Sequence, residues 1–400
     1  VAERTSKKPD VSLPGASARR VPRGVSMAGA GGTDPAGVAY YVGATLTYSV
    51  NGAQEVVPVN PARIIVKPEP QLVLDYFNPY EVLGDNPFTP QVEAPVPFPL
   101  AVRVLNAGYG PASKLKIDSA QPKIVANDQG LLVSFRLLGA SVNDSAVVPS
   151  LTVDIGTLGS KQIATAYWDM ISTLTGKFID FKVSFTHASE LGGELTSLIK
   201  ATNAHYLVHR VKVNLPGRDN RLDFLASAST STIGNPDHLP DTIYESEIPG
   251  NTGKPEDAQS PVTVVPVTLA PGRPTSSSPE VSMSVQTGKA GWVYARTDDP
   301  AQGLLRLLDV VRSDGVHLDP NNFWVQEGVD KNFQKIFTLH LLDYRADAAA
   351  PGTYRLVFTK PADDAIPPTT KLIFDGPVTG ADPKYAITPS TRVVPMATDK

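Results

Sequence analysis

Most of the chain consists of short, strand-like segments that clusters of Gly, Pro, Asn and Asp separate at turn-like intervals. Within these segments polar and apolar side chains alternate, as in residues 114–117 and 354–358. This alternation is typical of strands that bury one face. Many short strands at this spacing predict a β-sandwich. One segment, residues 190–199, is open to interpretation as a short helix or a loop.

The composition indicates a folded chain with more than one domain. Of its 400 residues 41% are hydrophobic, and the formal net charge is −4, so the chain is too apolar and too weakly charged to be wholly disordered. At about 150 residues per domain, two or three domains are expected. We expect an all-β fold of two Ig-like or fibronectin-like β-sandwich domains with an acidic linker and extended terminal segments. The expected parts are an irregular basic arm (residues 1–38), a short β segment (39–68), a first sandwich (69–215), the acidic linker (216–260), a second sandwich (261–378) and an extended tail (379–400).

Charge is distributed unevenly along the chain. Residues 1–25 carry six basic and two acidic side chains, whereas residues 216–257 carry three basic and eight acidic ones. A basic arm can bind nucleic acid, but this one lacks the interleaved aromatic residues that would stack on bases. We therefore interpret the arm as a solvated tail and expect no nucleic-acid partner. The acidic stretch is interpreted as a linker.

Cysteine is absent, which excludes disulfides, thiolate catalysis and Cys-ligated zinc or iron–sulfur centres. A large β-protein without thiols fits a bacterial exterior better than a eukaryotic one. No run of about 18 or more apolar residues occurs, so we expect no membrane insertion by a helix. The start at Val1, without Met, fits a mature secreted protein or a fragment. We expect an extracellular or cell-surface location.

Residues 39–67 read as strand, Asn-Gly turn, strand, Pro break and strand. Asn51-Gly52 is a strong signal for a two-residue hairpin loop. Leu46, Tyr48 and Val50 alternate with Thr and Ser, the pattern of a strand with one buried face. Three short strands cannot form a stable core, so they must pack elsewhere. We expect an end segment to pair with another copy of the chain; the alternative is that these strands are stumps of a longer repeat protein.

Three histidines are candidates for catalytic or metal chemistry. His205 and His209 have the spacing of a helical metal pair, but residues 204–213 are predicted to be a strand, where the two side chains lie about 13 Å apart. His187, followed by Glu190 and two glycines, is interpreted as a strand end that hydrogen-bonds into a loop. No Gly-x-Ser-x-Gly sequence is present to hold a nucleophile. We expect no catalytic residues and no enzyme activity.

Acidic and amide side chains gather near the predicted domain junctions. Calcium prefers several hard oxygen ligands from flexible loops, and an ion there would stiffen a junction. No EF-hand or nonapeptide calcium motif is present. Calcium is therefore the one candidate cofactor, and its candidate ligands are Asp75, Asp85, Asn86, Asp237, Asp241, Glu245 and Glu247.

The three tryptophans, Trp168, Trp292 and Trp324, distinguish two interpretations. An exposed aromatic row would stack on sugar rings, whereas burial of all three would count against carbohydrate binding. Trp168 and Met170 share one face of a predicted strand, which favours core packing for that residue.

The stretch "FPLAVRVLNAGYGPASKLKID" (residues 98–118) resembles the Ig-like, adhesion-type modules, similar to CARDB domains, of large secreted bacterial surface proteins. In those modules a strand ends in V-x-N-x-G-x-G-x-A, and Asn106, Gly108, Gly110 and Ala112 match that pattern. The resemblance covers about residues 60–255, with a weaker echo in 280–360. It implies an extracellular scaffold or adhesion role and supplies no catalytic residues.

Together these observations predict a non-enzymatic extracellular structural protein, a building block of a bacterial cell-surface layer, adhesin or filament. It would assemble through β-strand pairing, so its expected partners are other copies of itself in a homo-oligomer or filament, with surface glycans as a second partner class. The alternatives are a carbohydrate-binding or accessory module of a secreted enzyme and a phage or virus surface protein.

Overall fold

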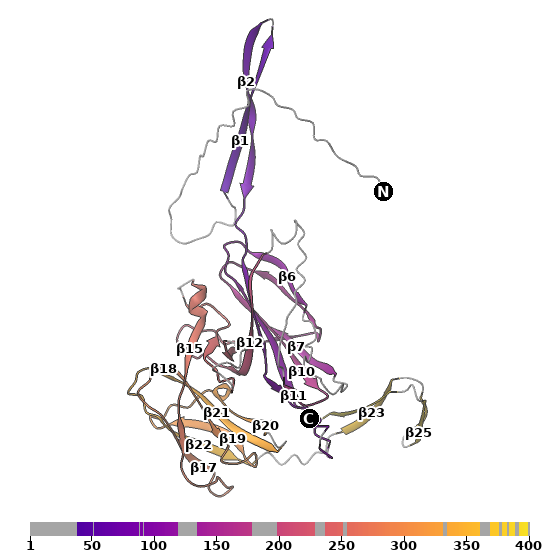
Figure 1. The fold of residues 1–400 in the computed structure, drawn as a ribbon, viewed down its shortest axis with the longest axis vertical. Coiled ribbons are helices and arrows are strands. Elements are labelled where there is room, and N and C mark those ends of the chain that lie inside the picture. Colours follow the sequence, from indigo (N-terminus) through magenta and orange to yellow (C-terminus); the bar gives the residue numbers. More distant parts are fainter. Residues whose placement is uncertain are drawn as a thin grey trace. The chain divides into compact units, whose positions relative to one another are not determined.

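The computed structural model is an all-β protein, which confirms the predicted fold class (Figure 1). Within the described residues, helical turns occur only in the 3-10 segments η2 (Pro255–Ala258) and η3 (Pro320–Asn322). No helix among the described residues is long and apolar enough to cross a membrane. The basic arm up to residue 37 and residues 190–197 lie outside the described part. The structure describes residues 38–50, 52–87, 89–90, 92–118, 134–177, 198–228, 237–250, 254–330, 334–360, 369–375, 378–381, 384–388 and 392–398.

The chain divides into two compact units. The first comprises Val1–Val265, Gly288–Ala295 and Leu342–Ala350, and the second comprises Pro266–Thr287, Arg296–Leu341 and Pro351–Lys400. This division differs from the expected boundary near residue 260, because two short segments from the later part of the chain belong to the first unit.

The first unit is built on a large mixed sheet. Its strands follow the order β15-β14-β13-β12-β3-β5-β10-β7-β8, and β18 lies beside β15. Most neighbours are antiparallel, but β12 runs parallel to β3 and β15 runs parallel to β18. The bounds are β3 (Leu72–Asn78), β5 (Phe98–Asn106), β7 (Phe135–Val142), β8 (Ser145–Val147), β10 (Ile163–Ser172), β12 (Ile199–Val211), β13 (Asp223–Ser227), β14 (Thr242–Tyr244), β15 (Gln259–Val264) and β18 (Gly291–Asp298).

Burial in the first unit follows from the sequences of its central strands. β5 reads as a near-continuous apolar run and is buried along almost its whole length, as a strand covered on both faces should be. Val102 and Val104 of β5 pack with Trp168 and Met170 of β10 in one core cluster. The prediction that Trp168 belongs to the core is therefore confirmed.

The structure places strands inside the segment expected to be an acidic linker, residues 216–260. β13 is buried along its whole length, with Phe224 and Leu225 completely covered, and Ile243 of β14 is equally buried. Several acidic side chains of this stretch accept hydrogen bonds from arginines or backbone N–H groups instead of facing water. High acidity therefore does not mark a solvated linker here.

The second unit contains a four-stranded sheet in the order β16-β17-β22-β19 and an antiparallel pair of β20 and β21. Tyr354, Leu356 and Phe358 of β22 are buried while their neighbours are more exposed, which confirms the alternation seen in the sequence. Met283 and Val285 of β17 are buried with the same period. The bounds are β16 (Val267–Leu269), β17 (Glu280–Val285), β19 (Arg306–Arg312), β20 (Phe323–Val329), β21 (Lys335–Arg345) and β22 (Thr353–Thr359).

Four smaller two-stranded pairs complete the described structure beside the long hairpin considered next. The expected extended tail over residues 379–400 instead contains paired strands, because β26 finds an antiparallel partner in β23 and β25 finds one in β24. The pairs are β4 (Glu81–Val82) with β11 (Gly176–Lys177), β6 (Ala112–Asp118) with β9 (Thr152–Leu158), β23 (Thr369–Asp375) with β26 (Arg392–Thr398), and β24 (Val378–Ala381) with β25 (Lys384–Ile387).

A long antiparallel hairpin, here called the ribbon, is formed by β1 (Val38–Val50) and β2 (Ala53–Val66) (Figure 1). Val50 pairs with Ala53 across a two-residue loop, and Gly52 has φ +80°, as the predicted turn requires. The expected Pro break does not occur, because Pro58 pairs opposite Thr45 within β2 and the register shifts beyond it, before Ala62. Residues 39–66 therefore form two strands instead of three.

Candidate functional site

The most concentrated polar cluster lies inside the first unit around Arg103 of β5. Its side chain is fully buried and donates from Nη1 to Asp75 Oδ2 at 2.7 Å. Nε donates to the backbone oxygen of Glu245 at 2.7 Å, and Nη2 donates to that of Ala258 at 3.1 Å. The β3–β5 register places Asp75 directly opposite Arg103, so strand pairing itself positions the ion pair.

Asp75 is the acceptor at the centre of this cluster. Its Oδ1 accepts a hydrogen bond from Asn203 Nδ2 at 2.8 Å and lies 3.4 Å from His205 Nε2. Burial alone would raise the pKa of Asp75, but the hydrogen bond to His205 and the charge of Arg103 outweigh it, so the pKa lies below its usual value. Asp75 is therefore ionised at neutral pH.

The two histidines of β12 lie in the predicted strand but in different surroundings. His205 Nδ1 is 3.0 Å from the backbone oxygen of Ala228 and 3.3 Å from Tyr244 Oη, and its ring lies close to those of Phe77 and Tyr244. These contacts hold His205 in place as a structural partner of Asp75. For His209, burial and the adjacent Arg210 charge lower the pKa to about 4, so this side chain is neutral at pH 7.

A second polar cluster involves residues 216–260, the segment that the sequence predicts to be an acidic linker. Glu245 accepts from Arg218 Nε at 2.6 Å and from Ser260 Oγ at 2.7 Å. Asp223 accepts from the backbone N–H groups of Val213 and Ser246 at 3.0 and 2.7 Å. Burial raises the pKa of Asp223 to about 7, and the nearby Glu245 carboxylate adds to the rise.

The structure does not bring the seven calcium candidates together into one site. Asp75 and Glu245 accept from Arg103 and Arg218, as described above. Asp85 accepts from the backbone N–H of Glu93, in a separate loop that also includes Asn86. Asp241 accepts from Ala228 N–H and Thr242 Oγ1, and Glu247 from Asp219 N–H; Asp237 lies in a turn.

Among the described residues, no group of three or more His, Asp or Glu side chains could hold a metal ion. The physical reason is visible at Asp75 and Glu245, where an arginine already neutralises the carboxylate. Calcium binding stays a prediction that no described contact supports. His187 lies outside the described residues.

The motif behind the family resemblance has a structural role. Asn106 is buried, and its Nδ2 donates to the backbone oxygens of Gly110, Leu158 and Gly159 while its Oδ1 accepts from Gln71 and Gly108 N–H. A Cβ on Gly110 would meet the backbone oxygen of Pro68 at 2.0 Å. Asn106 and the glycines thus allow three loops, residues 68–71, 106–110 and 158–159, to approach one another closely. The motif presents no reactive group.

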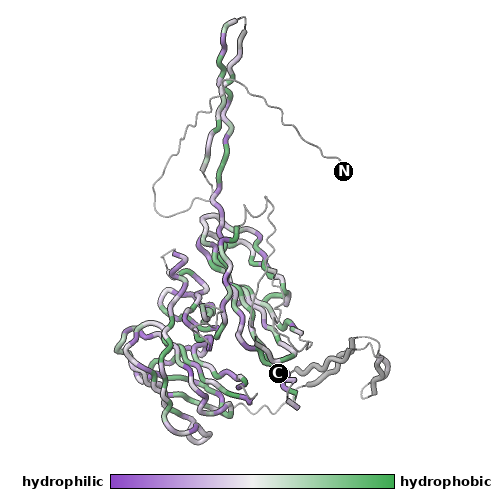
Figure 2. The backbone as a smooth tube through the Cα atoms, viewed as in Figure 1, coloured by the Kyte–Doolittle hydropathy of each residue, from purple (hydrophilic) through white to green (hydrophobic). Residues whose placement is uncertain are grey.

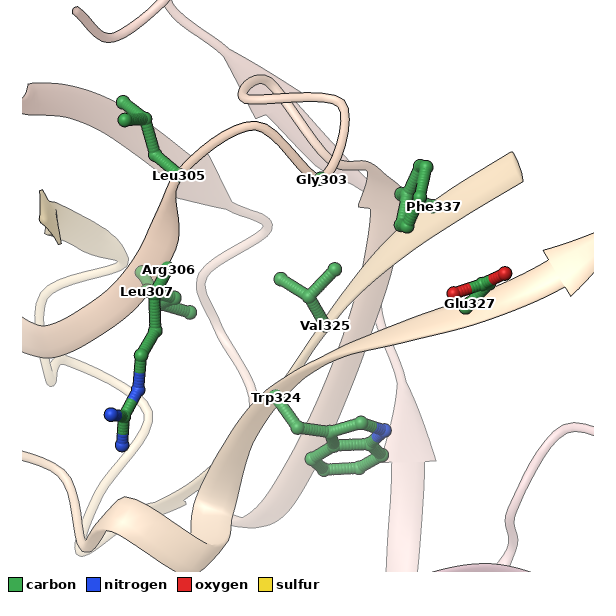
Figure 3. A pocket seen from close by; sticks show the side chains of 8 residues that line it. All are labelled: Gly303, Leu305, Arg306, Leu307, Trp324, Val325, Glu327 and Phe337. Atoms are coloured by element: carbon green, nitrogen blue, oxygen red, sulfur yellow. The ribbon is translucent and has the colours of Figure 1, made fainter. Parts of the chain in front are cut away.

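A shallow hollow of about 370 Å³ lies in the second unit. Trp324 and Glu327 of β20, Phe337 of β21 and Arg306 of β19 line it, with Arg306 and Glu327 on opposite sides (Figure 3). Trp324 is half-buried and stacks on His340 with ring centroids 4.7 Å apart. Trp168 and Trp292 are buried, so Trp324 alone of the three tryptophans reaches a surface hollow.

Many of the exposed large hydrophobic residues that the structure describes lie on the ribbon. Paired residues share a face, and β1 presents Tyr40, Val42, Leu46 and Tyr48 together on one of them. Each side chain of this apolar face is between 42% and 54% exposed. Hydrophobic segments recur along both strands (Figure 2). The apolar face, as the term is used below, consists of Tyr40, Val42, Leu46, Tyr48, Val57, Val59, Ile64 and Val66. Glu55, which pairs with Tyr48, lies on the same side of the ribbon near its loop.

A register shift keeps this face continuous. On β2 the apolar residues change from odd positions, Val57 and Val59, to even positions, Ile64 and Val66. Two residues, Asn60 and Pro61, oppose Gly43 at the shift, so both halves of β2 point to the same side. The opposite face carries Thr45, Thr47, Gln54 and Arg63 together with Tyr41, Val56 and Ile65.

Sequence reasoning missed the Arg103 cluster, although a signal was present. A single Arg in the apolar run FPLAVRVLN and a single Asp in LVLDYF each interrupt a buried strand. Such interruptions indicate buried charges that pair with each other.

No protein-family model matches the chain, and the searches of curated proteins and of solved structures also found no match.

Proposed function

We propose that the protein is a non-enzymatic extracellular structural protein that serves as a building block of a bacterial surface layer, adhesin or filament and assembles through β-strand pairing. The observation that carries this proposal is the ribbon. It exposes an apolar face and two strand edges that pair with no other strand among the described residues, and an isolated two-stranded hairpin is at best marginally stable in water. A partner that covers the ribbon resolves both problems.

The buried clusters support a structural role for the first unit. Arg103, Asp75 and His205 are buried and already bonded to each other or to backbone groups, so they hold strands together and offer no surface to a substrate. The thiol-free composition and the turn motif at Asn106 are consistent with the extracellular scaffold that the resemblance implies.

The test compares the full chain with a variant that lacks residues 1–67. The deletion ends before β3, which begins at Leu72, so the sheet of the first unit keeps all its strands. Light scattering after size-exclusion chromatography should show multimers for the full chain and monomers for the deletion variant. Equal masses per particle would contradict the proposal.

The second candidate function is carbohydrate binding, which the hollow beside Trp324 favours. The lining of the hollow includes the aromatic residues Trp324 and Phe337 together with Arg306 and Glu327, whose side chains offer hydrogen-bonding groups for sugar hydroxyls. Binding to immobilised bacterial surface glycans should be lost in Trp324→Ala and kept in Leu308→Ala, an exposed residue of the neighbouring strand β19. Equal glycan binding by the two variants, or none by the natural chain, would contradict this candidate.

A further inference from the structure

We propose that two copies of the chain join through the outer edges of their β1 strands, which pair antiparallel about a two-fold axis. The result is a four-stranded sheet in the order β2-β1-β1-β2 with one continuous apolar face. This inference rests on the proposed function and adds to it the partner, a second copy, and the edge that each copy uses.

The register of the ribbon defines which backbone groups face outward. A two-residue loop is closed by a hydrogen bond between its flanking residues, so Val50 and Ala53 form a hydrogen-bonded pair. Hydrogen-bonded and non-hydrogen-bonded pairs alternate in an antiparallel ladder. Thr45 opposite Pro58 and Thr47 opposite Val56 are therefore non-hydrogen-bonded pairs. Their N–H and C=O groups point away from the ribbon, toward its two edges.

The two edges are not equivalent. On β2 one of the outward positions is Pro58, which has no N–H to donate, and a second proline, Pro61, stands at the register shift. β1 contains no proline, so its outward positions keep every donor and acceptor. An added strand can therefore form an unbroken ladder with β1 but not with β2.

The side chains of β1 make a second copy a suitable partner. None of its residues is charged, whereas β2 carries Glu55 and Arg63. Natural edge strands that remain exposed usually carry charged residues that prevent pairing. Antiparallel pairing of β1 with itself brings no like charges together and uses the same surface on both copies, as a two-fold interface requires. It also places two apolar faces on one side of the sheet, which doubles the surface that further assembly can bury.

The test uses two matched proline substitutions at one cross-strand pair. Thr47→Pro removes an outward N–H from the β1 edge, and Val56→Pro removes the opposite outward N–H from the β2 edge; neither N–H serves the hairpin itself. Sedimentation over a concentration series should show at least a tenfold weaker association for Thr47→Pro and little change for Val56→Pro. Equal weakening in the two variants, or a larger effect of Val56→Pro, would overturn the edge assignment.

Cysteine cross-linking provides a readout that does not depend on proline tolerance. Because the chain has no cysteine, each introduced thiol is unique. Under mild oxidation, a scan of single cysteines along β1 should find a position near the two-fold axis that forms disulfide-linked dimers, whereas the same scan along β2 should find none. Cross-linking through β2 instead of β1 would contradict the edge assignment but would still agree with assembly through strand pairing. A wrong edge assignment and a wrong proposed function can be told apart. If the proposed function itself were wrong, the deletion of residues 1–67 would leave the particle mass unchanged.

Discussion

Arg103 and Asp75 face each other across strands β5 and β3 in a salt bridge of 2.7 Å, with side chains that are 0% and 2% exposed. The same guanidinium reaches the backbone oxygens of Glu245 and Ala258. One side chain thus joins the central strands of the first unit to the segment between β14 and β15. This linkage explains how an acidic, Pro-containing stretch becomes part of the sheet.

Replacing Arg103 with Met should lower the free energy of unfolding by about 3–5 kcal/mol, because a buried Asp75 would lose its cationic partner. Two buried backbone oxygens would also lose their donor. Urea unfolding followed by tryptophan fluorescence measures the change.

The control for that substitution is Lys116→Met. Lys116 and Asp154 form an ion pair of 3.6 Å in which both side chains are more than half exposed. Its removal should change the free energy of unfolding by no more than about 0.5 kcal/mol. Equal destabilisation by the two variants would show that the buried Arg103–Asp75 pair contributes no more to the free energy of unfolding than an exposed ion pair does.

Asp223 should make the protein less stable as the pH rises from about 4 to about 7. Burial raises its folded pKa to about 7, above the value of 3.8 for a free side chain, so the folded state retains a proton that the unfolded state has lost. Its stabilising contribution is therefore present at low pH and is lost as the pH rises through the folded pKa. The slope reaches at most about 1.4 kcal/mol per pH unit between the two pKa values.

Asp223→Asn should flatten this pH dependence. The amide can still accept one of the two backbone hydrogen bonds, from Val213 or Ser246, but it does not titrate. Thermal unfolding of both proteins between pH 4 and pH 8 gives the comparison, and the quantity of interest is the slope, not the absolute stability. Parallel curves would rule out Asp223 as the titrating group.

Gly110→Ala should destabilise the first unit by about 1–3 kcal/mol, since the new Cβ would lie 2.0 Å from the backbone oxygen of Pro68 and the loops would have to separate. The matched variant is Gly139→Ala, whose Cβ would meet its nearest atom, Asp169 Oδ2, at an ordinary 3.6 Å. Melting temperatures of the two variants should differ clearly, and a harmless Gly110→Ala would contradict the close approach.

Local patterns predicted the parts of the fold that depend on local chemistry. The Asn-Gly pair predicted the ribbon's loop, and the alternation around Leu46 predicted a strand. The burial expected for one face of that strand is not observed, because Leu46 and Tyr48 are 54% and 43% exposed. The alternation in residues 354–358 predicted which side of β22 is buried. Each of these signals lies within a few residues of the feature that it describes, so no knowledge of distant partners was needed.

Features that depend on distant partners were not predictable in the same way. The acidic, Pro-containing stretch around Glu245 predicts a linker, and its place in the sheet is not visible locally because Arg103, which binds the backbone oxygen of Glu245, lies 142 positions earlier in the chain. The prolines of residues 39–67 predict a break between strands, but the place of Pro58 in the ladder depends on the register, which only pairing with β1 defines. The sequence shows that Arg103 and Asp75 each stand within an apolar run, but it does not show that they contact each other. That contact follows from the β3–β5 register, which places them directly opposite.

Gly52 lies in the two-residue loop at the tip of the ribbon. Its φ of +80° is unfavourable for a β-branched residue, by roughly 1–2 kcal/mol. Gly52→Val should therefore destabilise the ribbon and, through it, weaken association about five- to thirtyfold, while the unfolding of the sheets that follow the ribbon stays unchanged. Gly43→Ala is the matched control within the same ribbon, because its Cβ would meet only Pro61 Cβ at 3.9 Å. Sedimentation and thermal unfolding of both variants test this expectation. A Gly52→Val protein that associates as tightly as the Gly43→Ala protein would mean that the folded ribbon does not hold the copies together.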